Sequence, residues 1–176
     1  MRRIVLTFGF ISGAVLSAMM GITMVAFHDQ FAFTDKGLLI GYTTMVLAFL
    51  LVYFGIRSYR DNVAGGVVNF GEAFQVGLLI MVISSACYVA TWEVIYFKFM
   101  PDFMDKYSAM ELDKAKKAGA TEADLAKKTK ELADFNQMYK NPLVNIGFTF
   151  REPLPVGLVM TLVSAGLLRR KEKLPA

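Results

Sequence analysis

Three long stretches without a charged residue constrain the fold of this chain more than any other feature of its sequence. They cover residues 4–27, 38–56 and 73–92, so they are 24, 19 and 20 residues long. A helix needs about 20 apolar residues to cross the hydrocarbon core of a bilayer, because it rises about 1.5 Å per residue. Each stretch therefore predicts a transmembrane helix.

The rest of the chain completes a four-span membrane protein. Its 176 residues are 55% hydrophobic and only 19% charged, too few charges to cover the surface of a soluble domain. A fourth apolar segment, residues 143–168, is interrupted only by Arg151-Glu152-Pro153. We predict an all-α integral membrane protein with a single membrane domain over residues 1–176. Its four transmembrane helices are expected at about residues 4–27, 38–56, 73–97 and 146–168.

The segment between the third and fourth spans differs in character. Residues 98–141 contain nine lysines and eight acidic residues, a pattern typical of a solvated surface. Gly119 separates two helical stretches, and Thr121 with Asp124 resembles a capping box at the start of the second. We expect an extracytoplasmic helical hairpin over about residues 101–140. A long extension of the third span packed against a returning helix, and a disordered tail-like segment, are the alternatives.

Basic residues beside the spans predict the orientation. Because four spans place both termini on one side, that side gathers eight Lys and Arg residues against Asp61, Glu72 and Glu172. The positive-inside rule makes this side cytoplasmic. The nine lysines of the long loop oppose that assignment, but most lie away from the membrane edge. The eight basic residues are Arg2, Arg3, Arg57, Arg60, Arg169, Arg170, Lys171 and Lys173.

The first span carries small residues at every fourth position: Gly9, Gly13, Ser17 and Gly21. Such a stripe extends the GxxxG pattern and lets two helix backbones approach closely in lipid. Its partner is either another helix of this chain or a second copy. The apolar run is about twice as long as the hydrophobic part of a signal peptide, and no A-x-A-like cleavage site follows it. We therefore expect an uncleaved span.

The connection between the second and third spans forms a cytoplasmic loop motif. Gly65-Gly66 allows a turn with positive φ, and Asn69 lies three residues before Glu72, the spacing of a helix N-cap with a carboxylate at the third helical position. Arg57 and Arg60 precede the turn. The motif is either an ordinary helix–loop–helix connection or a functional surface.

Four polar residues are predicted at the opposite, outer interface: His28, Glu93, Arg151 and Glu152. Glu93 lies 20 residues after Ala73, and Arg151 lies 18 residues before Arg169, so both counts end about 27–30 Å from the cytoplasmic edge. If the third and fourth spans are neighbours, the four residues form a polar cluster that lines an outward-facing pocket. The alternative is a set of separate interfacial anchors.

The stretch YFGIRSYRDNVAGGVVNFGEAFQVGLLI, with its Arg-rich segment, double glycine and F-G-E-A-F in order, resembles the signature of the domain of unknown function 4199 family. The tail PVGLVMTLVSAGLLRRK is similar to that family's last span and basic end. The resemblance implies four spans in a bacterial envelope, chiefly the inner membrane of Gram-negative species. No activity is assigned to that family, so the resemblance implies no catalytic residue.

We expect a non-catalytic inner-membrane protein that acts through helix packing with itself or with another membrane protein in the lipid bilayer. A small oligomeric transporter or passive channel is the alternative, although no ionisable residue is expected near mid-membrane, where proton coupling needs one. A membrane enzyme ranks third, because no metal-ligand cluster, nucleophile–base pair or phosphate loop is visible. We predict no cofactor, no metal and no nucleic-acid partner.

Overall fold

The computed structural model describes residues 1–27 and 34–169, and in these ranges the secondary structure is helical. Four segments are long and apolar enough to cross a membrane: Arg2–Ala26, Lys36–Asn62, Phe70–Phe99 and Pro142–Leu168. The predicted class, an all-α protein with four membrane-spanning helices, is confirmed. In chain order the helices are α1 (Arg2–Gly21), η1 (Ile22–Ala26), α3 (Asp35–Asn62), α4 (Phe70–Val94), η2 (Ile95–Phe99), α5 (Phe103–Lys117), α6 (Glu122–Tyr139), α7 (Pro142–Arg151) and α8 (Pro153–Leu168).

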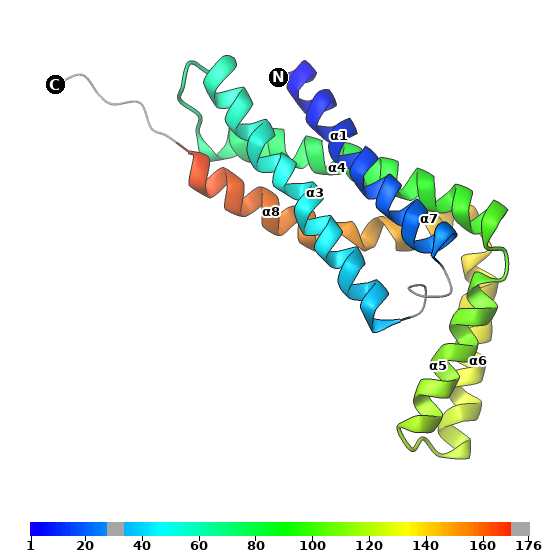
Figure 1. Ribbon diagram of the computed structural model, residues 1–176. Coiled ribbons are helices and arrows are strands. Elements are labelled where there is room, and N and C mark those ends of the chain that lie inside the picture. The colour runs from blue at the N-terminus through cyan, green and yellow to red at the C-terminus, as the bar shows by residue number, and fades with distance from the viewer. Residues whose placement is uncertain (28–33, 170–176) are drawn as a thin grey trace.

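Helix α4 is the centre of the bundle, since it packs against α1, α3, α7 and α8 (Figure 1). The N-terminus, the turn between α3 and α4 and the end of α8 lie at one end, which we call the terminal end. Helices α5 and α6 project from the other end, which we call the hairpin end. The two ends differ in how tightly their helices pack.

At the terminal end, large side chains fill the space between the helices. Phe49, Val52, Ile56, Ile80 and Met81 are at most 1% exposed and belong to one buried cluster. Glycines let the backbones approach: a Cβ added at Gly77 would lie 2.8 Å from Thr161 Cγ2. Close packing of this kind drives helix association in lipid, where burial of apolar surface gives little.

Local signals in the sequence set several helix ends. Asn69 caps α4, and its side chain and that of Glu72 form the predicted capping box. Thr121 and Asp124 form the second one at the start of α6. Gly65, Gly66 and Gly119 have positive φ, a conformation that glycine adopts without a steric cost. These features of the prediction are confirmed.

At the hairpin end the helices are less regular. The spans that begin with α1 and α4 both finish in π-helical turns, η1 and η2. The fourth span breaks between α7 and α8 at Glu152-Pro153, where proline cannot continue the hydrogen-bond ladder. Helices α5 and α6 lie side by side (Figure 1). That this pair lies outside the cytoplasm stays a prediction.

Candidate functional site

A groove of about 670 Å³ opens at the hairpin end, between the outer parts of α1 and α3, the face of α5, and the α7–α8 joint. We call it the hairpin-end groove. Six methionines and eight aromatic residues supply most of its walls: Met19, Met20, Met24, Met45, Met104 and Met110 with Tyr42, Tyr88, Trp92, Phe103, Tyr107, Phe135, Tyr139 and Phe148. Volumes of 300–1,000 Å³ are usual for small-molecule sites, and methionine lets such walls adapt.

The α7–α8 joint contributes two charged side chains to this mostly apolar groove. Arg151 and Glu152 both line it, and Tyr88 of α4 donates a hydrogen bond of 2.8 Å from its hydroxyl to Glu152 Oε2. Arg151 has no ion-pair partner among the described residues, although it lies next to Glu152 in sequence. The phenol therefore holds the carboxylate, and the guanidinium stays free for another group.

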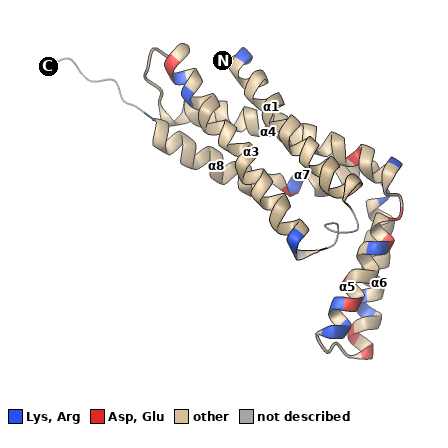
Figure 2. Ribbon diagram, in the orientation of Figure 1, with Lys and Arg blue, Asp and Glu red and all other residues tan. Residues whose placement is uncertain are grey.

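Charged residues such as Arg151 and Glu152 are unusual within the bundle, most of which carries no charge, as Figure 2 shows. Charged residues gather along α5 and α6 and at the helix ends. Arg151 and Glu152 belong to the span Pro142–Leu168, and Arg151 lies about 26 Å from the last residue of that span at 1.5 Å per residue, the depth that the sequence predicts for the outer interface. Ionisable residues within a span are costly and usually face a cavity or a partner.

One wall of the groove is held by a chain of hydrogen bonds between α4, α6 and α7. Trp92 Nε1 donates to Tyr139 Oη at 3.0 Å, the Tyr139 and Thr149 hydroxyls lie 3.3 Å apart, and Thr149 donates to Asn145 Oδ1 at 3.1 Å. Because the Thr149 hydroxyl donates to Asn145, it accepts from the Tyr139 hydroxyl. Burial raises the pKa of the Tyr139 phenol. The chain fixes the hairpin against the bundle.

Aromatic rings reinforce the same junction. The Phe103 and Tyr139 rings meet Trp92 and Tyr96 in edge-to-face contacts, with the Trp92 and Phe103 centroids 4.8 Å apart. Phe135 of α6 contacts Phe148 of α7 at 5.1 Å. Such pairs add about 0.5–1.5 kcal/mol each beyond the apolar area that they bury. The junction is therefore a small core of its own.

The structure does not bring the predicted polar cluster together. His28 lies outside the described residues. Glu93 does not line the groove and forms no ion pair with Arg151, and one of its carboxylate oxygens is buried without a hydrogen-bond partner. Of the three cluster residues that the structure describes, Arg151 and Glu152 share a site.

Helix register explains why Glu93 and Arg151 miss each other, although α4 and α8 are neighbours. Gly77 meets Thr161 and Gly157 meets Met81, so the antiparallel register sets Glu93 level with Asn145. Asn145 lies six residues beyond Arg151, or about 9 Å along the axis. The two sequence counts assumed that Ala73 and Arg169 lie at one depth, and this register offsets them.

The small-residue stripe of the first span packs against α4 of the same chain. A Cβ at Gly9 would lie 2.9 Å from Ile83 Cβ, and one at Gly13 would lie 2.7 Å from Cys87 Cβ. Ser17 joins the contact, because Thr91 donates a 2.7 Å hydrogen bond to its hydroxyl. Three of the four positions are thus occupied within the chain.

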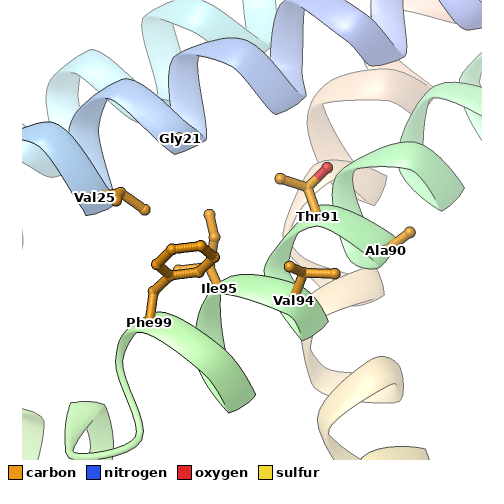
Figure 3. Close-up of a pocket in the computed structure, with 7 residues that line it drawn as sticks. All are labelled: Gly21, Val25, Ala90, Thr91, Val94, Ile95 and Phe99. Carbon is orange, nitrogen blue, oxygen red and sulfur yellow. The ribbon is translucent and has the colours of Figure 1, made fainter.

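Gly21 behaves differently, since nothing lies within 4 Å of a Cβ added there. It borders a shallow apolar depression of about 520 Å³ between the π-helical turns (Figure 3). Val25, Ala90, Thr91, Val94, Ile95 and Phe99 line the rest of it. With one hydroxyl and no charge, this surface offers little for a polar ligand to recognise.

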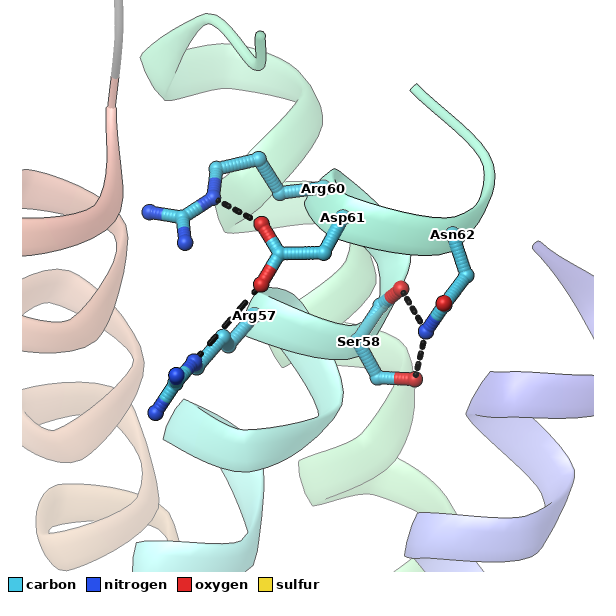
Figure 4. A network of polar contacts seen from close by, with 5 residues as sticks. All are labelled: Arg57, Ser58, Arg60, Asp61 and Asn62. Atoms are coloured by element: carbon cyan, nitrogen blue, oxygen red, sulfur yellow. Dashed lines mark hydrogen bonds and ion pairs between the residues drawn. The ribbon is translucent and has the colours of Figure 1, made fainter. Parts of the chain in front are cut away.

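The loop motif predicted between the second and third spans forms a compact ion network at the end of α3 (Figure 4). Asp61 accepts from Arg60 Nε at 2.7 Å and lies 3.6 Å from Arg57 Nε. Asn62 donates to the Ser58 carbonyl and hydroxyl. These contacts, with the glycine turn and the Asn69–Glu72 capping box, form the helix–loop–helix connection that the sequence predicts. A functional surface at this motif stays a prediction.

Tyr88 and the walls of the groove were not among the predicted site residues. Tyr88 lies in the middle of an apolar run, where a single tyrosine resembles any other span residue. The signal available beforehand was the pair Arg151-Glu152 inside an apolar segment, which pointed to polar partners on a facing helix. Among the described residues, no three His, Cys, Asp or Glu side chains gather in a group that suits a metal ion.

Comparison with known proteins yields one match. A family model described as a protein of unknown function (DUF4199) matches residues 7–170, nearly the whole chain. No curated protein and no solved structure matches it.

Proposed function

The chain belongs to the DUF4199 family of proteins of unknown function, which assigns it no activity, and we propose from its geometry that it is a non-catalytic protein of the bacterial inner membrane that acts by binding another protein or a second copy of itself. Its four apolar helices make it a multi-pass membrane protein. Both termini are cytoplasmic in this proposal, and the α5–α6 pair faces the periplasm.

The observation that carries the proposal is the fixed attachment of α5 and α6 to the bundle. The hydrogen-bond chain from Trp92 through Tyr139 to Thr149, together with the aromatic junction, joins the pair to α4 and α7. A fixed attachment presents the solvent-exposed surface of the pair, which we call its far face, in one orientation. Such a surface loses little conformational entropy when a partner binds.

The far face of α5 and α6 suits a water-facing contact. Lys127 with Glu131 and Lys117 with Asp113 form exposed i,i+4 pairs on it, each worth only about 0.5 kcal/mol to stability. Their charges are therefore more useful for selecting a partner than for holding the fold. By contrast, the stripe of α1 is already in contact with α4, so the proposed contact uses other surfaces.

A topology measurement tests the first part of the proposal. A reporter active only in the periplasm should be silent when fused after Ala176 and active when inserted at Gly119, which lies in the turn between α5 and α6. The reverse pattern would place the pair in the cytoplasm and overturn the assignment.

Site-specific photocrosslinking in native membranes tests the second part. A photoactivatable residue at Lys130, exposed on α6, should give one adduct of defined mass that mass spectrometry identifies, twice the monomer mass if the partner is a second copy. The matched control is Leu132, half-buried on the same helix, where that adduct should be absent. Equal adducts at both positions, or none at Lys130, would argue against this contact surface.

The second candidate is a small oligomeric transporter or passive channel, and the hairpin-end groove favours it because it offers a ligand-sized opening with charged residues inside a span. Phe49, Val52 and Ile80 fill the terminal half of the bundle, so passage would run between copies. Solute release from proteoliposomes that rises with a higher power of the protein-to-lipid ratio would support a pore. No release at any ratio would leave the binding role.

A further inference from the structure

Arg151 is an unpaired cation that lines the hairpin-end groove, where it could bind an anion. It ends α7 inside the fourth span, lines the hairpin-end groove and has no ion-pair partner among the described residues. An unpaired charge inside a membrane span is unfavourable, and a guanidinium binds carboxylate or phosphate groups through two parallel hydrogen bonds. A charged partner for Arg151 would therefore come from outside the described fold.

The groove walls beyond Arg151 suit an apolar part of a ligand. Met20, Met45, Trp92, Phe103 and Met104 line them, and methionine and aromatic surfaces adapt to flexible apolar chains. Along α3 the groove reaches from Thr34 to Met45, eleven residues or about 16 Å. That length is about half of the hydrocarbon thickness of roughly 30 Å, so it suits one acyl chain.

The volume argues against a helix as the occupant. A helix with its side chains is about 10–12 Å wide and rises about 5.4 Å per turn, so each turn fills about 400–600 Å³. A groove of about 670 Å³ therefore holds little more than one turn. A membrane span from a second copy or another protein needs several turns of contact, whereas a single extended chain fits.

We propose that the hairpin-end groove binds a single-chain amphiphilic anion, a long-chain carboxylate being the simplest, with its anionic group on Arg151 and its apolar chain along the methionine and aromatic walls. Glu111 and Lys114 also line the groove, but they are paired, Glu111 with Lys114 at 4.0 Å and with Lys128 at 2.9 Å. The unpaired guanidinium of Arg151, the mostly apolar walls and the length of the groove along α3 therefore each favour this occupant.

Tyr88 is a positioning residue in this site. Its hydroxyl holds Glu152 Oε2 at 2.8 Å, which keeps that carboxylate from pairing with Arg151. Without the phenol hydroxyl, Glu152 becomes free to turn to the adjacent guanidinium and compete with the anion. The hydrogen bond therefore keeps Arg151 available.

Trp92 allows a direct test, because it is the single tryptophan of the chain and lines the groove. A dibrominated stearic acid quenches tryptophan fluorescence at short range, so its titration into the detergent-solubilised full-length protein should give saturable quenching. Its methyl ester has the same chain without the charge and should give only weak quenching without saturation. Equal, saturable quenching by acid and ester would overturn the role of the anionic group.

Variants then locate the anion site. Arg151→Gln should weaken the binding of the brominated acid at least about tenfold, since a hydrogen bond to a charged group is lost. Arg151→Lys should retain part of the affinity, because the charge stays while the paired geometry is lost. Tyr88→Phe should weaken binding severalfold, and Arg57→Gln, at the terminal end, should leave it unchanged. Wild-type affinity in Arg151→Gln, or an equal loss in Arg57→Gln, would overturn the site.

Failure of this site and failure of the proposed partner contact are distinguishable. The crosslinks at Lys130 report the far face of α6, and Trp92 quenching reports the groove. Saturable quenching without a Lys130 adduct supports the ligand site alone. The reverse result removes the ligand site and leaves the partner contact.

Discussion

The two ends of the bundle are built from the same four spans and packed in opposite ways. At the terminal end Gly77 and Gly157 bring α3, α4 and α8 together, and large side chains leave no room between them. At the hairpin end two of the spans finish in π-helical turns, and a groove of about 670 Å³ remains. Irregular turns of this kind often accompany functional sites.

This difference indicates which end of the bundle has room for a ligand. Small residues stabilise a membrane bundle only where backbones touch, so the terminal end supplies the stability. The hairpin end is held instead by aromatic contacts and by hydrogen bonds between side chains of α4, α6 and α7. Such contacts join helices at a distance and leave space between them.

The largest effect is expected where the first span meets α4. Gly13→Leu should destabilise the protein by about 3 kcal/mol, at the upper end for overpacked sites, because a side chain there meets Cys87 and the Ser84 backbone. Gly21→Leu, on the same helix with nothing within 4 Å, is the matched control. The rate at which a maleimide modifies Cys87, the single cysteine, reports opening of the interface. Equal rates in both variants would remove the distinction between tight and open positions.

A smaller and local effect is expected at the hairpin junction. Tyr139→Phe leaves the buried Trp92 N–H without its acceptor, which costs about 1–3 kcal/mol. Amide hydrogen exchange should speed up in α5 and α6 and stay unchanged at the terminal end. Tyr107→Phe removes a hydroxyl from the same hairpin that makes no hydrogen bond among the described residues, so it should change little. Uniformly faster exchange after Tyr139→Phe would mean that the two ends unfold together.

Within the hairpin, the cap of α6 offers a pH-dependent test. Thr121→Ala removes the side chain that caps the helix, at a cost of about 1 kcal/mol. The hydrogen bond from the Thr121 hydroxyl lowers the pKa of Asp124. A lowered pKa gives stability that is present above the unfolded pKa of about 4 and is lost as the pH falls below it.

Helicity of the hairpin, followed by circular dichroism, should therefore fall below about pH 4 in the wild type. The part of this change that comes from Asp124 should be missing in Thr121→Ala. An identical acid profile in both proteins would show that the cap does not stabilise α6.

The smallest effect is the coupling between Glu93 and Arg151. They lie at different levels of the bundle and form no ion pair, so the double-mutant cycle of Glu93→Gln and Arg151→Gln should give additive changes in thermal stability. For sites that share no partner, deviations stay within about 0.5 kcal/mol. A larger coupling would mean that the helices shift past one another in the membrane, and that the hairpin end adjusts more than its geometry indicates.

The sequence by itself determined the four spans and the local helix ends. Uncharged runs of span length, the Asn69–Glu72 and Thr121–Asp124 capping boxes and the turn at Gly119 all act within a few residues. Each can therefore be predicted without knowledge of which helices pack against it. The small-residue stripe could be predicted in the same way, although the helix that it contacts could not.

Only the tertiary structure decided which surfaces meet. It packs α4 against the stripe of α1 and offsets Glu93 from Arg151 along the helix axis. It also brings Glu152 within hydrogen-bonding distance of Tyr88, 64 residues away in sequence. The register between neighbouring helices follows from close contacts such as Gly77 with Thr161 and Gly157 with Met81, which join distant parts of the chain. Counting residues from the edge of a membrane fixes depth to a few ångströms at best, and that error is large enough to separate an ion pair.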